Sequence, residues 1–177
     1  MTDDALWYEA ALLVGITNAL NVVADSPLQS LEPAEASPEA EAVFADVRAF
    51  YERAVPVAFR RLAGDPSYLA DVWAATRRAF ADHRLTRRFK EALAFAVSVT
   101  TRSGFGTTFH LEEMRRLGVG PRGVTEVLGV TQMFSSYTKI ADTLQLESDM
   151  HDLAPVDASP APGGSPRPRP GKAKGHA

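Results

Sequence analysis

Apolar side chains recur every three or four residues along most of the chain, which is the spacing of amphipathic helices. In residues 3–24, Leu6, Leu13 and Leu20 fall on one face, and further apolar residues widen it. The same spacing predicts helices over residues 38–52, 56–62, 66–82, 86 to about 101, about 107–118 and about 121–146. No segment alternates apolar and polar residues long enough to predict a strand. We therefore expect an all-α fold, an orthogonal array of about six to seven helices without a sheet.

Short polar residues stand where several of these helices are expected to begin. Such side chains accept a hydrogen bond from the first helical turn, and proline is favoured at the first helical position. The predicted N-caps are Ser37, Asp65 and Thr86 and, after the glycine-containing turn 102–106, Thr107 or Thr108. Gly118 is expected to end the helix that carries His110.

The apolar spacing also assigns a buried face to two of the later helices. In the helix from Thr86 this face consists of Phe89, Leu93, Ala96, Val97 and Thr100. In the last helix it consists of Val124, Val127, Leu128, Thr131, Phe134, Tyr137, Ile140, Ala141 and Leu144. The first and last helices are apolar over wide arcs, which is typical of helices that are buried or shared with another subunit.

The composition changes at about Pro155. Residues 155–177 are rich in Pro, Gly, Ala, Ser and Arg, and such a segment cannot bury enough apolar area to offset the entropy of ordering. The sequence therefore predicts one helical domain over residues 1–154, beginning with a helix at 3–25, and a disordered basic tail over 155–177.

Charge and cysteine content narrow the possible functions. The chain of 177 residues contains no cysteine, which excludes disulfides, thiolate metal sites and thiol redox chemistry within it. Its formal net charge is −3, and the tail is basic, so the charge of the helical domain alone is more negative than that of the whole chain. An acidic domain argues against nucleic acid as a partner. The apolar run 92–97 is far shorter than the roughly 20 residues that cross a bilayer, and the chain opens with acidic residues. We expect a cytoplasmic protein without membrane association.

Four segments together resemble a known family. They are Val55–Leu69 (VPVAFRRLAGDPSYL) with Trp73, Leu85–Ser98 (LTRRFKEALAFAVS), Phe109-His110-Leu111 with Leu117-Gly118-Val119, and Val124–Leu128 (VTEVL). In this order and spacing they resemble the carboxymuconolactone decarboxylase and alkylhydroperoxidase D-like family. The resemblance implies that residues 38–147 form the family's helical core and that the chain assembles as a homo-oligomer, a trimer or hexamer.

The resemblance also implies roles for individual residues. Glu91 and His110 stand at the family's glutamate and histidine positions. The peroxidase branch has two cysteines where this chain has Ser103 and Gly106, and it often has a second histidine where this chain has Phe105. Serine forms neither a sulfenic acid nor a disulfide, so cysteine-dependent peroxidase activity is excluded. The decarboxylase branch also lacks the cysteine pair, so its chemistry is not excluded.

The leading hypothesis is a lyase-like enzyme that uses acid–base chemistry without a metal or cofactor. Its substrate would be a small organic acid or lactone, and decarboxylation or isomerisation would suit it. Glu91 and His110 would share the proton, because a carboxylate partner fixes the imidazole tautomer and raises its basicity. Ser103, Phe105 and Tyr137 are the candidate substrate-binding residues.

Other interpretations remain open. Glu91 could be an exposed acid paired with Arg87 one turn earlier, and His110 could be a packed core histidine. The chain would then be a non-catalytic relative that serves as a binding or assembly module. A helical hydrolase of the haloacid dehalogenase kind is a further alternative, and it would need an acid or amide over a water in the core. The candidates for that role are Asp71, Asp142 and Asn18.

Overall fold

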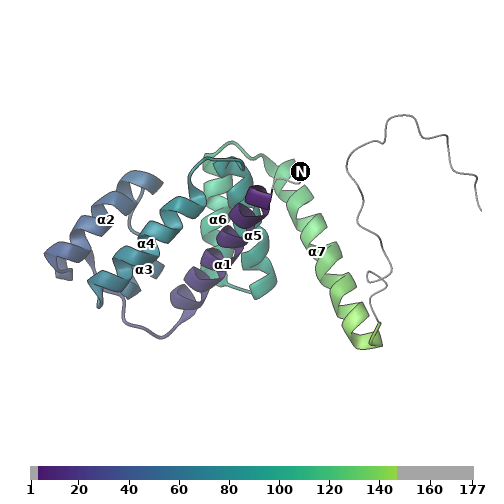
Figure 1. Ribbon diagram of the computed structural model, residues 1–177, viewed down its shortest axis with the longest axis horizontal. Helices are drawn as coiled ribbons and strands as arrows, with labels where there is room; N and C mark the ends of the chain where they lie inside the picture. Colours follow the sequence, from purple (N-terminus) through teal and green to yellow (C-terminus); the bar gives the residue numbers. More distant parts are fainter. Residues whose placement is uncertain (1–3, 147–177) are drawn as a thin grey trace, which may run out of the picture. The chain divides into compact units, whose positions relative to one another are not determined.

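The computed structural model describes residues 4–146, which form seven α-helices and one short 3-10 turn (Figure 1). The helices are α1 (Asp4–Asp25), α2 (Pro38–Tyr51), α3 (Val57–Leu62), α4 (Pro66–Phe80), α5 (Arg87–Thr101), α6 (Gly104–Arg116) and α7 (Pro121–Leu144), with the 3-10 turn at Pro33–Glu35. Residues 4–146 contain no strand, which confirms the expected all-α fold. The predicted tail at 155–177 lies outside the described residues.

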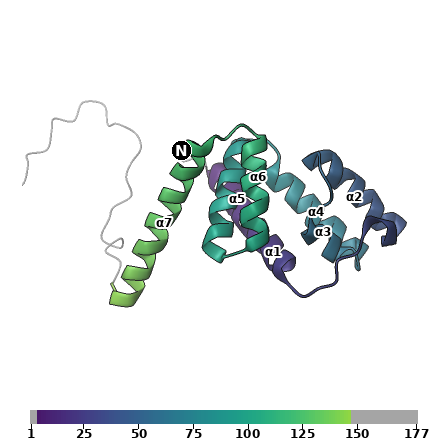
Figure 2. The same ribbon diagram turned by 180° about the vertical axis from the view of Figure 1, so that it is seen from behind.

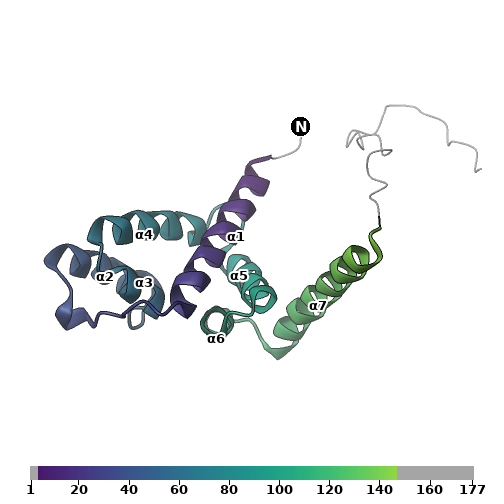
Figure 3. The ribbon, with the colours of Figure 1, turned by 90° about the horizontal axis from the view of Figure 1, so that it is seen from below.

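Helix α1 is at the centre of the packing. It lies against α3, α4, α5 and α6, and Figure 3 shows it crossing the bundle between α4 and α5. Its buried residues are Leu13, Thr17, Leu20, Asn21 and Ala24. They recur at helical spacing, so one stripe of α1 closes the core while the opposite side faces outward.

The outward side of α1 is also apolar. Trp7, Tyr8 and Val22 are each more than half exposed. Among the described helices, α1 is the one whose length and composition would suffice to cross a membrane. Core helices and signal sequences share these properties, so the match carries little weight by itself.

Two clusters of buried apolar side chains form the core. The larger one joins α1 to α2, α3 and α4 and is rich in aromatic rings, with Trp73 in edge contact with both Phe50 and Phe59. The Trp73 indole N–H donates to Asp46 Oδ2 at 2.7 Å, which satisfies its one polar atom. The smaller cluster joins Leu13 of α1, Ala79 and Phe80 of α4, and Ala94 of α5.

The predicted N-caps are confirmed with one exception. Ser37, Asp65 and Thr86 cap α2, α4 and α5 as predicted, each accepting a hydrogen bond from the backbone N–H three residues later. Helix α6 begins at Gly104, so the prediction of a start at Thr107 or Thr108 was wrong. Ser103 is its N-cap and accepts from Gly106 N at 3.0 Å. The glycine-containing segment is therefore the first turn of α6, and α6 lies against α5 (Figure 2).

The buried face of α5 is not the one that its apolar spacing predicts. The residues facing the core are Lys90, Glu91, Ala94, Phe95 and Ser98, while Phe89 is 51% exposed. The inward polar groups all have partners: Lys90 pairs with Glu9, Glu91 with His110, and Ser98 with Asn21. Because these pairs form only on folding, the polar side of the helix can be buried and the apolar stripe is left facing outward.

The prediction of a buried face on α7 was also wrong. None of its residues is buried, although its spacing predicted a continuous buried face. Its main packing partner is α5, and the packing covers only part of its wide apolar arc.

We predict that the buried ion pair between α1 and α5 is essential for stability. Lys90 is fully buried, and its Nζ lies 2.5 Å from both Glu9 Oε1 and Ala81 O. Lys90→Ala leaves the Glu9 carboxylate without its cation and should lower the free energy of unfolding by about 3–5 kcal/mol. The exposed pair of Arg122 and Glu126 is the control, and Arg122→Ala should cost less than about 1 kcal/mol. Urea denaturation measures both, and equal effects would contradict the prediction.

Candidate functional site

Glu91 and His110 meet directly. Glu91 lies in the second turn of α5 and His110 in the second turn of α6, and their side chains face each other between these adjacent helices. His110 Nδ1 lies 2.8 Å from Glu91 Oε2. Glu91 is fully buried and His110 is 4% exposed. A carboxylate can only accept, so Nδ1 carries the proton and Nε2 is left to exchange one.

Arg87 supplies positive charge beside this pair. Its Nε lies 3.4 Å from Glu91 Oε1, one helical turn along α5, and its Nη2 lies 3.2 Å from Glu113 Oε2. Glu113, itself 1% exposed, also accepts from Arg116 at 2.8 Å. The hydrogen bond that Arg116 donates to Glu113 raises the pKa of Arg116. The site is therefore an alternating chain of acids and bases in which each buried charge has an opposite neighbour.

Aromatic rings enclose the network. The Phe80 ring stacks on the His110 imidazole at 5.7 Å with an interplanar angle of 5°, and Phe109 meets it edge-on at 5.2 Å. The Arg87 guanidinium lies over the rings of Phe50 and Tyr51, at 4.0 and 5.0 Å from their centroids. These rings exclude water, which strengthens the interactions between the charges.

The alternative interpretation of Glu91 as an exposed acid was wrong, because its side chain is fully buried. The pairing with Arg87 that this interpretation included is present. The i, i+4 spacing of Arg87 and Glu91 is visible in the sequence. Glu113 and Lys90 were missed, because nothing in their local sequence distinguishes them from exposed charged residues. Asn21 was also missed; its amide donates to Ser98 Oγ at 3.0 Å and joins α1 to α5.

The residues at the two cysteine positions have structural contacts. Ser103 caps α6 and also lines a cleft of about 340 Å³ beside Asn21. A Cβ at Gly106 would lie 2.1 Å from Asn21 Oδ1 and 2.4 Å from Ser98 Oγ, so no side chain fits there. Phe105 stacks on Phe109 at 5.4 Å and packs against the larger core cluster.

The candidate substrate-binding residues do not share a cavity with the Glu91–His110 pair. None of the five principal clefts among residues 4–146 is lined by Glu91 or His110. Tyr137 lines none of these clefts either; it lies on α7 and is 61% exposed. The roles of Ser103, Phe105 and Tyr137 in binding stay predictions.

The candidate residues for a hydrolase or a metal site are not in positions that would support these functions in the described residues. Asp71, Asp142 and Asn18 are all exposed, so none offers the core carboxylate or amide that a helical hydrolase would need. Within residues 4–146, no three or more His, Asp and Glu side chains gather in an arrangement that could hold a metal ion.

Comparison with known proteins finds similarity to one family. Residues 66–146, from α4 to the end of the described chain, match the model of the carboxymuconolactone decarboxylase family. This part of the chain is similar to that family. The structure is also similar to the crystal structure of an alkylhydroperoxidase AhpD core from Rhodospirillum rubrum, with a TM-score of 0.66 and 25% sequence identity over 73% of this chain and 98% of that one. No curated protein matches the chain.

The similarity to these proteins does not bring peroxidase chemistry with it. The chain has no cysteine, so it lacks the thiolate that a thiol peroxidase oxidises. At the second cysteine position the Asn21 amide occupies the space that a sulfur would need.

We predict that the fold requires glycine at position 106, because neighbouring side chains leave no room for a Cβ there. Gly106→Ala should destabilise the fold by about 3 kcal/mol, because its Cβ would displace the Asn21–Ser98 hydrogen bond. Gly104→Ala is the matched control in the same helical turn; its Cβ would meet no atom within 4 Å, so it should be neutral or slightly stabilising. Thermal unfolding followed by circular dichroism measures both. A tolerated Gly106→Ala would show that the close packing is dispensable.

Because Tyr51 is buried, we predict that its ionisation lowers the stability of the fold at alkaline pH. Burial raises the pKa of Tyr51 well above its ordinary value, and the negative charge of Glu91 adds to this effect. The unfolded chain ionises this phenol near pH 10 while the native chain keeps it protonated. The contribution of Tyr51 is therefore complete below about pH 10 and is lost as the pH rises toward the native pKa. The free energy of unfolding should fall less steeply above pH 10 in Tyr51→Phe than in the unmodified chain, and identical slopes would contradict this.

Proposed function

We propose that this chain is a cofactor-independent acid–base enzyme of the lyase or isomerase kind that acts on a small organic acid or lactone. The observation that carries the proposal is the 2.8 Å contact between His110 Nδ1 and Glu91 Oε2 in surroundings nearly closed to water. The carboxylate orients the imidazole and fixes its tautomer, so that Nε2 is the nitrogen that can exchange a proton. The family resemblance supports the same two residues.

The proton transfer follows from this geometry. His110 Nε2 takes a proton from a carbon next to a carbonyl group, and the electron pair of the broken C–H bond moves into the carbonyl to give an enolate. Returning the proton to a different carbon completes an isomerisation. In a decarboxylation, His110 first takes a proton from water at Nε2. The substrate carboxylate then leaves as carbon dioxide, the electrons of the broken C–C bond form the enolate, and the imidazolium returns its proton to the enolate carbon. In both cases Glu91 stabilises the positive imidazolium and no external oxidant or reductant is needed.

Access to Nε2 requires local movement. The Phe80 and Phe109 rings cover the imidazole, and none of the five clefts reaches it. A substrate must therefore displace at least one of these rings. This arrangement favours a substrate with an apolar body beside its carbonyl group, because the displaced contact is apolar.

We predict that both members of the pair are required for turnover. A thermal-shift screen of small carboxylates and lactones identifies a substrate candidate, and its conversion is followed by NMR. Glu91→Gln and His110→Ala should each lower kcat by at least about 100-fold, the usual contribution of a general acid–base group. The matched controls are Glu126→Gln, 66% exposed in its side chain, and His83→Ala, 70% exposed in its side chain; both should retain full activity. Full activity in either test variant would refute the mechanism.

The second candidate is a binding or assembly module without catalytic activity. In such a protein the Glu91–His110 pair would only stabilise the packing of α5 against α6. The covering aromatic rings and the absence of Glu91 and His110 from the five clefts favour it. The same variants distinguish the two. A purely structural pair would lower the free energy of unfolding when broken, while no carboxylate or lactone would raise the melting temperature of the unmodified chain.

A further inference from the structure

The two rings that cover the His110 imidazole differ in their distance from solvent. Phe80 is fully buried and belongs to the smaller core cluster. Phe109 is 8% exposed and meets the imidazole edge-on, with 5.2 Å between the ring centroids. A ring that already touches solvent can turn outward, and the apolar body of a substrate can fill the space that it leaves. We therefore expect a substrate to reach His110 past Phe109.

A guanidinium group lies over the Phe109 ring. Arg53 belongs to the connection between α2 and α3, and its Cζ is 5.2 Å from the centroid of that ring. The Arg53 side chain is 37% exposed, so it lies on the solvent side of Phe109. The planar guanidinium binds a carboxylate through two parallel hydrogen bonds. An organic acid that approaches His110 past Phe109 therefore meets Arg53.

The present partners of Arg53 can be exchanged for a ligand. Its Nη2 donates to Glu112 Oε2 at 2.7 Å, and the Glu112 side chain is 48% exposed. Its Nη1 lies 3.6 Å from Glu113 Oε1, which is too long for a hydrogen bond. An ion pair as exposed as that of Arg53 and Glu112 contributes little to stability. A ligand carboxylate can therefore take the place of Glu112.

The buried acid nearby does not depend on Arg53. Glu113 accepts from Arg116 Nη2 at 2.8 Å and from Arg87 Nη2 at 3.2 Å, so it keeps two cations when Arg53 turns to a ligand. Of these three guanidinium groups, Arg53 is the one that makes no hydrogen bond to a buried carboxylate within residues 4–146. It is therefore the cation of this network that is available to a substrate.

The distances limit the length of such a substrate. The Arg53 Cζ and the centre of the His110 imidazole each lie 5.2 Å from the Phe109 centroid, so they are at most about twice that distance apart. Most of this length is taken up by the hydrogen bonds of the carboxylate and by the approach of a carbon to about 3–3.5 Å from Nε2. The carboxylate and the reacting carbon are therefore about two or three bonds apart.

We propose that Arg53 selects the substrate by binding a carboxylate that lies about two or three bonds from the reacting carbon, while the apolar body of the substrate replaces the Phe109 ring beside His110. The inference rests on the proposed function, from which it takes His110 as the group that transfers the proton. It adds a substrate class, a short carboxylate with one apolar group, and the residue that recognises it.

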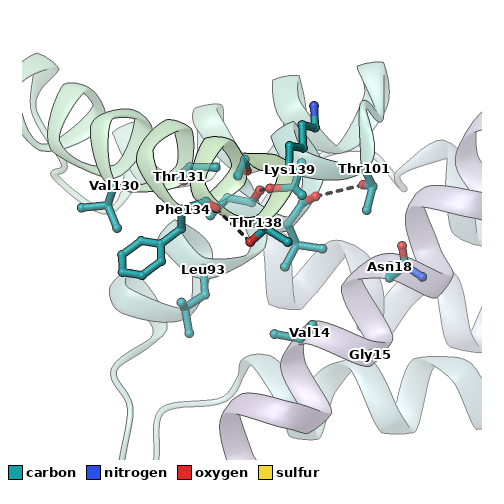
Figure 4. Close-up of a pocket in the computed structure, with 14 residues that line it drawn as sticks. Val14, Gly15, Asn18, Leu93, Thr101, Val130, Thr131, Phe134, Thr138 and Lys139 are labelled. Atoms are coloured by element: carbon teal, nitrogen blue, oxygen red, sulfur yellow. Dashed lines mark hydrogen bonds between the residues drawn. The ribbon is translucent and has the colours of Figure 1, made fainter. Parts of the chain in front are cut away.

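The largest of the five clefts suits such an acid less well. It has a volume of about 680 Å³ and lies between α1, α5 and α7, where Val14, Leu93 and Phe134 line it (Figure 4). Four threonine hydroxyls in it donate to the carbonyl four residues earlier in their own helices, at 2.7 to 3.0 Å: Thr100, Thr101, Thr131 and Thr138. These donors are used within the helices. The one cationic side chain that lines the cleft is Lys139, which provides a matched control.

Calorimetric titration with hydrocinnamate, in which a two-carbon chain joins a phenyl ring to a carboxylate, tests the proposal. Arg53→Gln should weaken binding at least about tenfold, because it removes a charge-assisted pair. Arg53→Lys should restore part of the affinity, since it keeps the charge but not the planar fork. Glu112→Gln should strengthen binding by up to about fivefold, because it removes the acid that competes for Arg53. A purely structural role of Arg53 would not give effects of opposite sign.

Two controls separate this site from general binding of an apolar acid. The methyl ester of hydrocinnamate has the same body without the charge, so Arg53→Gln should leave its affinity unchanged. Lys139→Gln removes the cation of the large cleft and should leave the affinity for hydrocinnamate unchanged. Circular dichroism checks that each variant keeps its helix content.

NMR gives a second readout, which reports where the probe binds. The imidazole C–H resonances of His110, assigned by their absence from His110→Ala, should shift when hydrocinnamate is added. Those of His83, whose side chain is 70% exposed, should not shift. At the same concentration of hydrocinnamate, Arg53→Gln should show no shift of the His110 resonances.

The results distinguish this inference from the proposed function. The inference is overturned if hydrocinnamate does not bind up to the millimolar range, if Arg53→Gln binds it as well as the unmodified chain, or if Lys139→Gln abolishes binding. It is also overturned if an acid is converted with a kcat that depends on His110 while Arg53→Gln leaves KM unchanged; the proposed function then stands. Binding through Arg53 without conversion of any carboxylate would instead refute the proposed function and leave the carboxylate site in place.

Discussion

The pairing of buried charges on the inner side of α5 is the constraint on which the rest of this fold depends. Glu91 and Lys90 are both fully buried, and a buried charge without a partner is costly. Glu91 finds His110 and Arg87, and Lys90 finds Glu9. These pairs draw α1 and α6 onto α5 in fixed positions and determine which side of α5 faces inward.

The same constraint also determines what lies on the outer side of α5. Since α5 turns its polar side to the core, its apolar stripe with Leu93 and Val97 faces the cleft beside α7. Helix α7 covers that stripe only in part, and none of its own residues is buried. The Glu91–His110 pair and the apolar cleft therefore lie on different sides of α5, and the orientation of this helix places both.

The positions that the resemblance assigns to a cysteine pair are part of the helix packing in this chain. Ser103 caps α6, and Gly106 lets the Asn21 amide reach Ser98 between α1, α5 and α6. A side chain at position 106 would collide with this hydrogen-bonded polar contact. The similarity to the carboxymuconolactone decarboxylase family therefore concerns the helical core of this chain and does not give its reaction.

What the sequence determined by itself was local: the all-α fold, most helix boundaries, the caps at Ser37, Asp65 and Thr86, and the family resemblance through Glu91 and His110. These depend on residues within one or two helical turns, which periodicity and capping read directly. Only the tertiary structure decided the start of α6 at Gly104, the inward face of α5, and the exposure of α7. The long-range partners of Glu91, Lys90 and Asn21, which are His110, Glu9 and Ser98, lie 19 to 81 positions away along the chain. Periodicity counts a polar residue as exposed unless such a partner is known.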